Sequence, residues 1–477
     1  MLFNSLPFAL FLPAVFVAYW FAFRRPLWLQ NLLLLVASYL FYGWWDWRFL
    51  LLIFASSLVD FLVGGALERT QRPLLRRILL GVSLGVNLGV LGFFKYFNFF
   101  IDSFAEVLTS LGLQANLPTL TVILPVGISF YTFQTLSYTI DIYRGQIRST
   151  RNPLVFFTFV SFFPQLVAGP IERAASLLPQ FQRPRVFDPE VAKDGLRQML
   201  WGFFTKIVVA DNMAPHVSAI FDNYATLSSG DLLLGAFLFA IQIYGDFAGY
   251  SNIAIGTAKL FGFSLMQNFA YPYFSRNIAE FWRRWHISLS TWFRDYLYIP
   301  LGGSRVVRSR RIFNIIVTFT VSGFWHGASW TFIVWGFLNG LYYLLIMLGE
   351  RQNQFTDVVA QGRVLPSLRE LMAMLATFFV TLVAWVFFRS SSVTDAFLYL
   401  ARLFTLAPAG ETYSGYTQAL LLAATLLVVE WFRRDKPHPL QLDATPPVAR
   451  WLVYVVLLLA ILVLGSFGEQ AFIYFQF

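Results

Sequence analysis

Apolar segments long enough to cross a lipid bilayer recur along almost the whole of this 477-residue chain. The first four are Leu6–Phe23, Leu27–Trp44, Phe49–Leu67 and Ile78–Phe94, and a helix needs about 20 apolar residues to cross the hydrocarbon core. Only 13% of the residues are charged, against about 25% in soluble domains. The sequence therefore predicts an all-α polytopic membrane protein, with residues 1–477 forming a single integral membrane domain.

The later apolar segments predict further spans and bring the expected number to about 11–12 transmembrane helices. They are Pro118–Ile140, Leu196–Ala210, Leu232–Leu260, Ile312–Phe324, Ser329–Leu348, Leu371–Phe388, Ala419–Phe432 and Trp451–Phe467. Leu154–Ala168 is shorter, and Pro164 and the Gly169–Pro170 pair interrupt it. We expect a re-entrant or interfacial helix there, because broken helices at membrane depth do not face lipid.

Basic residues indicate how the predicted spans are oriented. Arg24 and Arg25 follow the first span and no basic residue precedes it, which places that loop in the cytoplasm and the N-terminus outside. Further basic clusters begin at Arg69 and Arg144, after the third and fifth spans. This alternation predicts a multi-pass membrane protein with both termini outside the cytoplasm.

Composition excludes several kinds of chemistry. The chain has no cysteine, so disulfides, thiolate metal sites and a cysteine nucleophile are excluded. The net charge of +10 comes from arginines concentrated in short loops, where they set orientation and contact anionic lipid. We expect neither nucleic-acid binding nor a metal site, since the sequence contains no motif typical of either.

Arginines alternate with aromatic residues between Arg276 and Arg311, which predicts a cytoplasmic structure lying half-buried at the membrane face. In a helix, Arg283, His286 and Ser290 share one face. That face suits an anionic, phosphate-bearing cosubstrate. It equally suits an interfacial helix whose arginines contact lipid head groups.

His326 lies between two predicted spans, within an otherwise hydrophobic region. Ionisable groups at membrane depth are costly and therefore mark functional sites. A histidine there suits proton transfer near neutral pH, and Gly323 and Gly327 allow a second backbone or a substrate to approach closely. The alternative is a histidine that only links helices by hydrogen bonds.

The sequence also gives expectations for the surroundings of three other polar residues. Asp246 lies within a predicted span, and a buried carboxylate needs a partner, which we expect to be a histidine or one of the arginines. His216 and His438 lie in predicted loops beside prolines. We expect both of these histidines to be solvated.

The longest distinctive motif is Phe281–Arg294, followed by Asp295–Ile299 and Leu301–Gly303. The others are Leu124–Phe133, Ala168–Pro170, Trp325–Gly327 and the final Tyr474–Phe477. In these motifs the chain resembles the membrane-bound O-acyltransferase (MBOAT) family, specifically its bacterial polysaccharide branch. The resemblance extends along nearly the whole chain.

This resemblance implies an MBOAT-like helical bundle with re-entrant or interfacial helices and a central tunnel. It matches His326 and His286 to the two family histidines, so we expect both to be catalytic, with His326 as general base. The expected substrate- and donor-binding residues are Arg283, Arg284, Trp285, Ser290, Arg294, Asp295, Trp325 and Asp246.

The implied activity is transfer of an acetyl group from a cytoplasmic thioester toward an exported polysaccharide. The expected cosubstrate is acetyl-CoA or another acyl thioester, with no bound cofactor. The implied surroundings are the bilayer of the bacterial inner membrane, a periplasmic or extracellular SGNH-type acetyltransferase partner and polysaccharide export machinery.

Three alternatives stay open at this stage. The first is D-alanyl or other acyl transfer from a carrier protein to a cell-wall polymer. The second is a transporter or lipid flippase, although such proteins often carry inverted repeats and none is evident here. The third is a scaffold subunit of an exopolysaccharide export complex without chemistry of its own.

Overall fold

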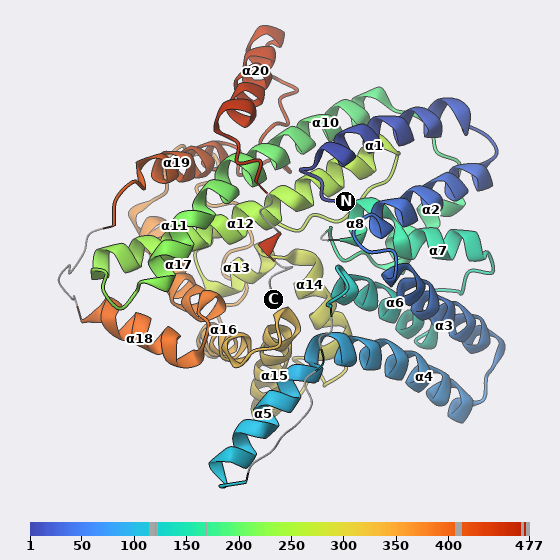
Figure 1. Ribbon diagram of the computed structural model, residues 1–477, viewed down its shortest axis with the longest axis horizontal. Helices are drawn as coiled ribbons and strands as arrows, with labels where there is room; N and C mark the ends of the chain where they lie inside the picture. Colours follow the sequence, from blue (N-terminus) through green and yellow to red (C-terminus); the bar gives the residue numbers. More distant parts are fainter. Residues whose placement is uncertain (114–119, 121–122, 168, 406–412, 469–471, 474–477) are drawn as a thin grey trace. The chain divides into compact units, whose positions relative to one another are not determined.

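The computed structural model describes residues 1–477 except 114–119, 121–122, 168, 406–412, 469–471 and 474–477. Within the described part, all regular secondary structure is helical (Figure 1), which confirms the predicted all-α class. Ala168, the first residues of the predicted span Pro118–Ile140 and the motif Tyr474–Phe477 lie outside the described residues.

Contacts divide the chain into two compact units, Met1–Ala192 with Thr257–Met266, and Lys193–Gly256 with Gln267–Phe477. Whether the chain acts as the single domain expected from its sequence stays a prediction.

The α-helices of the described residues are α1 (Leu6–Val17), α2 (Leu27–Gly43), α3 (Phe49–Arg69), α4 (Pro73–Leu91), α5 (Phe97–Ser110), α6 (Ile128–Tyr143), α7 (Pro153–Ser161), α8 (Phe163–Leu166), α9 (Ala174–Gln182), α10 (Pro189–Phe203), α11 (Asp211–Asp222), α12 (Ser229–Leu260), α13 (Ile278–Arg284), α14 (Ile287–Phe293), α15 (Arg308–His326), α16 (Trp330–Leu348), α17 (Leu368–Arg389), α18 (Val393–Phe404), α19 (Thr417–Phe432) and α20 (Pro447–Leu464).

Six helical segments of the described chain are long and apolar enough to cross a membrane. They are Phe49–Arg69, Pro73–Ser110, Ser229–Leu260, Trp330–Leu348, Leu368–Arg389 and Pro447–Leu464, and three shorter apolar helices are Leu6–Ala22, Leu27–Gly43 and Thr417–Phe432. All twelve predicted spans overlap helices in this structure. A multi-pass membrane protein follows, because a backbone in lipid must satisfy its own hydrogen bonds.

Two local expectations have different outcomes. The helical structure that contains the expected span Ile78–Phe94 extends beyond that apolar segment, because a π-helical turn at Gly92–Tyr96 joins α4 to a further helix, α5. The segment expected to be broken is broken: α7 ends at Ser161, and α8 has only four residues.

A buried polar cluster joins three helices of the first unit. The Asp60 carboxylate on α3 accepts hydrogen bonds from Ser83 and Asn87 on α4 and from Thr139 on α6. Each of these side chains is at most 1% exposed. A polar group at membrane depth is tolerated only when it is hydrogen-bonded, so the cluster holds α3, α4 and α6 side by side (Figure 1).

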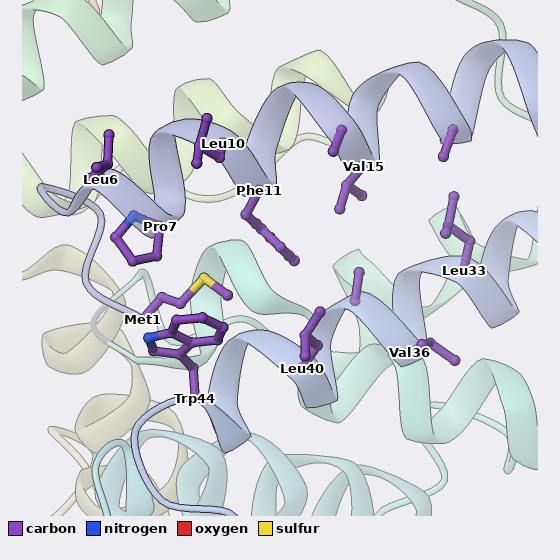
Figure 2. Close-up of a pocket in the computed structure, with 13 residues that line it drawn as sticks. Met1, Leu6, Pro7, Leu10, Phe11, Val15, Leu33, Val36, Leu40 and Trp44 are labelled. Carbon is purple, nitrogen blue, oxygen red and sulfur yellow. The ribbon is translucent and has the colours of Figure 1, made fainter.

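An apolar groove of about 610 Å³ lies between α1 and α2 in the first unit (Figure 2). Phe11 of α1 points toward α2, while Leu40 and Trp44 form part of the opposite wall. Its lining is almost entirely hydrocarbon and aromatic. The groove therefore suits apolar contents and does not provide groups for acyl-transfer chemistry.

Candidate active site

His326 is the last residue of α15, at the turn into α16. Gly327 is extended, and the Ser329 side chain caps α16 by accepting from the Thr331 N–H. The His326 side chain is buried, at 2% exposure, among aromatic rings. The ring centroids of Trp325 and Trp335 lie 5.0 Å from its own, and that of Phe388 lies 5.4 Å away.

Glycines let α15 and α16 approach closely beneath this turn, and the two helices lie side by side (Figure 1). A Cβ atom at Gly323 would lie 2.2 Å from the Phe332 carbonyl oxygen and 2.9 Å from the Gly336 Cα. A Cβ at Gly327 would lie 2.1 Å from an atom of the Phe332 ring. The prediction that a second backbone approaches closely is confirmed at Gly323, whereas at Gly327 the close neighbour is the Phe332 side chain.

Replacing Gly323 with alanine is expected to force α15 and α16 apart, because the methyl group has no room. We expect a loss of about 1–3 kcal/mol in stability, as for other overpacked sites, together with reduced acyl transfer. Thermal unfolding in detergent measures the first effect. The matched control is Gly85→Ala on α4, where a Cβ meets nothing within 4 Å; equal unfolding temperatures for the two variants would contradict the prediction.

His286 lies at a break between two short helices. Helix α13 ends at Arg284, Trp285 is extended, and His286 adopts the left-handed conformation (φ 42°, ψ 56°) before α14 begins at Ile287. The expected helix with Arg283, His286 and Ser290 on one face is therefore wrong. A left-handed backbone is unfavourable for a non-glycine residue and is found preferentially at functional sites.

The break turns His286 into the protein interior, where it is 0% exposed. Its ring centroid lies 6.5 Å from that of His326, 6.2 Å from Trp325 and 4.6 Å from Phe247. Burial lowers the pKa of His286 to about 3, because desolvation disfavours the charged form. The structure thus brings the two expected catalytic histidines together and keeps His286 neutral.

The nitrogens of the His286 ring have different surroundings. Nδ1 lies 3.3 Å from Oδ1 of the buried Asn268. Nε2 is buried and has no hydrogen-bond partner among the residues that the structure describes. A buried acceptor without a partner costs about 1–3 kcal/mol, so Nε2 is available for a substrate group.

The arginines beside His286 bind their own chain. Arg283 donates to the Gln352 carbonyl oxygen at 2.6 Å and also to that of Phe355. Arg284 forms an ion pair with Glu280 at 2.9 Å and donates to the Asp357 carbonyl oxygen. In this structure both guanidinium groups therefore hold the segment between α16 and α17, and a role in donor binding stays a prediction.

The other expected donor-binding residues separate into two groups. Trp285 is buried against Trp385, with ring centroids 5.0 Å apart. The Trp325 ring centroid lies 5.0 Å from that of His326 and 6.2 Å from that of His286. Ser290 donates to the Trp285 carbonyl oxygen at 3.3 Å. Arg294 and Asp295 form an ion pair with each other.

Asp246 has a partner that the sequence did not suggest. Its Oδ1 lies 2.6 Å from Lys206 Nζ, and its Oδ2 accepts from the Ile473 backbone N–H at 2.7 Å. Lys206 also pairs with Asp211 at 2.7 Å. The expectation of a histidine or arginine partner is wrong; the signal that was overlooked is a lone lysine in the apolar segment Leu196–Ala210.

The remaining histidines are less solvated than expected. His438 is 1% exposed and its Nε2 lies 2.9 Å from Asp194 Oδ1, so the prediction of a solvated side chain is wrong for His438. The loop prediction is wrong for His216, which lies on helix α11 with its Nδ1 2.6 Å from the Tyr413 hydroxyl. Sequence reasoning also missed Asn268, Trp335 and Phe388, which belong to no motif that suggests a role.

Comparison with known proteins identifies the family of this chain. Residues 143–386, which include His286 and His326, match the MBOAT, membrane-bound O-acyltransferase family. The chain belongs to this family. The MBOAT membership confirms the resemblance found in the sequence and makes the protein a membrane acyltransferase.

Individual relatives support the same conclusion. A Pseudomonas putida protein named "Probable alginate O-acetylase AlgI" is 36% identical, and the alignment covers 100% of both chains. A Helicobacter pylori "Peptidoglycan O-acetyltransferase" is 36% identical over 83% of this MBOAT chain and 78% of its own. A Streptococcus thermophilus "Teichoic acid D-alanyltransferase" is 30% identical over 45% of this chain and 55% of its own.

Proposed function

We propose that this MBOAT protein moves an acetyl group from a cytoplasmic thioester toward an exported polysaccharide. The observation that carries the proposal is the pair His286 and His326, with ring centroids 6.5 Å apart inside an aromatic shell. Relatives named as O-acetylases that align with most or all of the chain support acetyl as the acyl group.

In the proposed reaction, His326 acts as general base. It takes the proton from an acceptor hydroxyl while the oxygen attacks the thioester carbonyl carbon. The carbon–sulfur bond then breaks, and the departing thiolate receives the proton from the His326 imidazolium. His286 is neutral and contributes a hydrogen-bond acceptor that orients a substrate.

The donor that we propose is acetyl-CoA or another acyl thioester, without a bound cofactor. Arg283, Arg284, Arg294 and Asp295 lie near one another in sequence, and the exposed Arg294 side chain is accessible to a charged donor, beside the half-buried Asp295. Trp285, Ser290 and Trp325 complete the proposed donor site, together with Asp246, which directly precedes Phe247, whose ring centroid lies 4.6 Å from that of His286.

The proposed setting is the bacterial inner membrane, with both termini outside the cytoplasm. The acetyl group then leaves the protein on the external side, so an acceptor must be present there. We propose a periplasmic or extracellular SGNH-type acetyltransferase as that partner, together with polysaccharide export machinery. The proposal of a central tunnel follows from the need to connect a cytoplasmic donor with this external acceptor.

A transfer assay with two labelled donors tests the proposal. Vesicles containing the purified protein receive either ¹⁴C-acetyl-CoA or a carrier protein loaded with ¹⁴C-D-alanine, together with the polysaccharide or partner. We expect protein-dependent label in the acceptor from acetyl-CoA. Label from the carrier protein alone would establish the D-alanyl alternative, for which a relative covering under half of the chain exists, and label from neither would overturn the proposed acetyl transfer.

A further inference from the structure

Asn268 connects the His286 ring to helix α12. The Asn268 Nδ2 donates to the Ser251 hydroxyl oxygen at 3.1 Å, and its Oδ1 accepts from the Ser288 hydroxyl at 2.6 Å. The same Oδ1 lies 3.3 Å from His286 Nδ1. Asn268, Ser288 and His286 are all 0% exposed, and Ser251 is 2% exposed.

The orientation of the Asn268 amide determines which ring nitrogen of His286 carries the proton. An amide oxygen only accepts hydrogen bonds, so the nitrogen that faces it must donate. With Nδ2 directed at Ser251, Oδ1 is the atom that faces the His286 ring. Nδ1 therefore carries the hydrogen, and a neutral imidazole then has its lone pair on Nε2.

The Asn268 backbone makes a separate hydrogen bond at the break between α13 and α14. Its carbonyl oxygen accepts from the Ile287 N–H at 2.9 Å, immediately after the left-handed His286. That bond does not involve the Asn268 side chain. A substitution of the side chain consequently leaves the main-chain connection in place and changes the hydrogen bonds to the ring.

We propose that Asn268 is a positioning residue, which holds His286 in the Nδ1–H tautomer and leaves Nε2 as an acceptor for a substrate hydrogen-bond donor. The described residues offer Nε2 no hydrogen-bond partner, and the neighbouring His326 ring marks where the reaction occurs. The substrate group is an O–H of the acceptor or an N–H of the thioester donor. The catalytic part of this inference rests on the proposed function, whereas the tautomer does not.

Nitrogen NMR of the full-length protein in lipid tests the tautomer directly. Protein labelled with ¹⁵N-histidine contains four histidines, and the His286 signals are those that disappear in His286→Ala. We expect a protonated Nδ1 and an unprotonated Nε2. A wild-type His286 that carries its proton on Nε2 would overturn the proposal without any measurement of activity.

Two substitutions then test the role of Asn268. Asn268→Leu has a similar size and cannot accept from Nδ1, so we expect loss of the Nδ1–H preference and a turnover reduced about 10- to 100-fold, as when other groups that orient a histidine are removed. Asn268→Asp retains an oxygen that accepts, so Nδ1 should stay protonated. The matched control is Asn314→Leu, which removes another fully buried asparagine that donates to the Gly303 carbonyl oxygen.

Kinetic constants distinguish the two substrates that could donate a hydrogen bond to His286 Nε2. If Asn268→Leu raises the KM for the acetyl thioester, the group that donates to His286 Nε2 is an N–H of the thioester. If it lowers kcat or raises the KM for the hydroxyl substrate, the group is the O–H of that substrate. Retention of the Nδ1–H tautomer in Asn268→Leu, or unchanged kinetics when the tautomer is lost, would overturn the positioning role. A wild-type protein with the expected tautomer and no acetyl transfer would instead contradict only the proposed function.

Discussion

Replacing His326 with alanine is expected to lower acetyl transfer about 10²- to 10⁴-fold, the usual contribution of a general base. The side chain is enclosed by Trp325, Trp335 and Phe388, so water has little room to substitute for it. The loss should appear in kcat, because proton transfer belongs to the reaction step and the thioester binds in the ground state without it. Transfer from ¹⁴C-acetyl-CoA by purified protein in vesicles measures the effect.

The matched control for this variant is His216→Ala. His216 is partly buried and bonds to the Tyr413 hydroxyl, so the same substitution removes a structural histidine away from the described His286–His326 pair. We expect this control to keep its turnover. Both variants should elute as single species with similar unfolding temperatures, and wild-type turnover in a folded His326→Ala protein would eliminate His326 as the base.

The predicted spans agree with the structure because hydropathy reports a physical requirement. A chain in lipid must bond its backbone internally, so apolar segments of sufficient length become helices. The predicted span Leu27–Trp44 corresponds to α2 at Leu27–Gly43, and Phe49–Leu67 corresponds to α3 at Phe49–Arg69. The shift of a few residues at helix ends depends on capping and on local contacts, which hydropathy does not describe.

The geometry around His286 could not be predicted from sequence patterns. Helical spacing placed Arg283, His286 and Ser290 on one face, but the left-handed backbone of His286 interrupts that spacing. Histidine adopts this conformation only occasionally, so its presence here depends on tertiary packing. Asn268 lies 18 residues earlier in the chain, and no motif indicates that its side chain meets the ring.

Long-range ion pairs were missed for a similar reason. Asp246 is buried and ion-paired, as expected for a carboxylate within a span. Its partner Lys206 lies 40 residues earlier, and sequence separation carries no information about which basic residue is opposite. The same applies to His438, whose partner Asp194 is 244 residues away.

Replacing Lys206 with methionine is expected to cause the largest loss of stability among the substitutions considered. The ammonium group lies between Asp211 and Asp246, at 2.7 and 2.6 Å, and the side chains of all three residues are at most 5% exposed. Methionine fills a similar volume but leaves two buried carboxylates facing each other. Removing one partner of a buried ion pair costs about 3–5 kcal/mol, so the midpoint of thermal or denaturant unfolding should fall clearly.

A surface lysine provides the control for this experiment. Lys436 pairs with Asp435 at 3.1 Å, but the two side chains are 42% and 57% exposed. Exposed ion pairs contribute about 0–1 kcal/mol, so Lys436→Met should unfold close to the wild type. Similar unfolding midpoints for Lys206→Met and the wild type would show that the buried cluster does not stabilise the second unit.

The cause of the loss can be separated from simple repacking. Adding Asp211→Asn and Asp246→Asn to Lys206→Met removes every charge of the cluster, and an asparagine at 246 still offers an oxygen to the Ile473 N–H. We expect this triple variant to recover most of the lost stability, because no unpaired charge is left buried. Recovery would assign the defect to uncompensated carboxylates, whereas a triple variant as unstable as Lys206→Met would assign it to the shape of the lysine side chain.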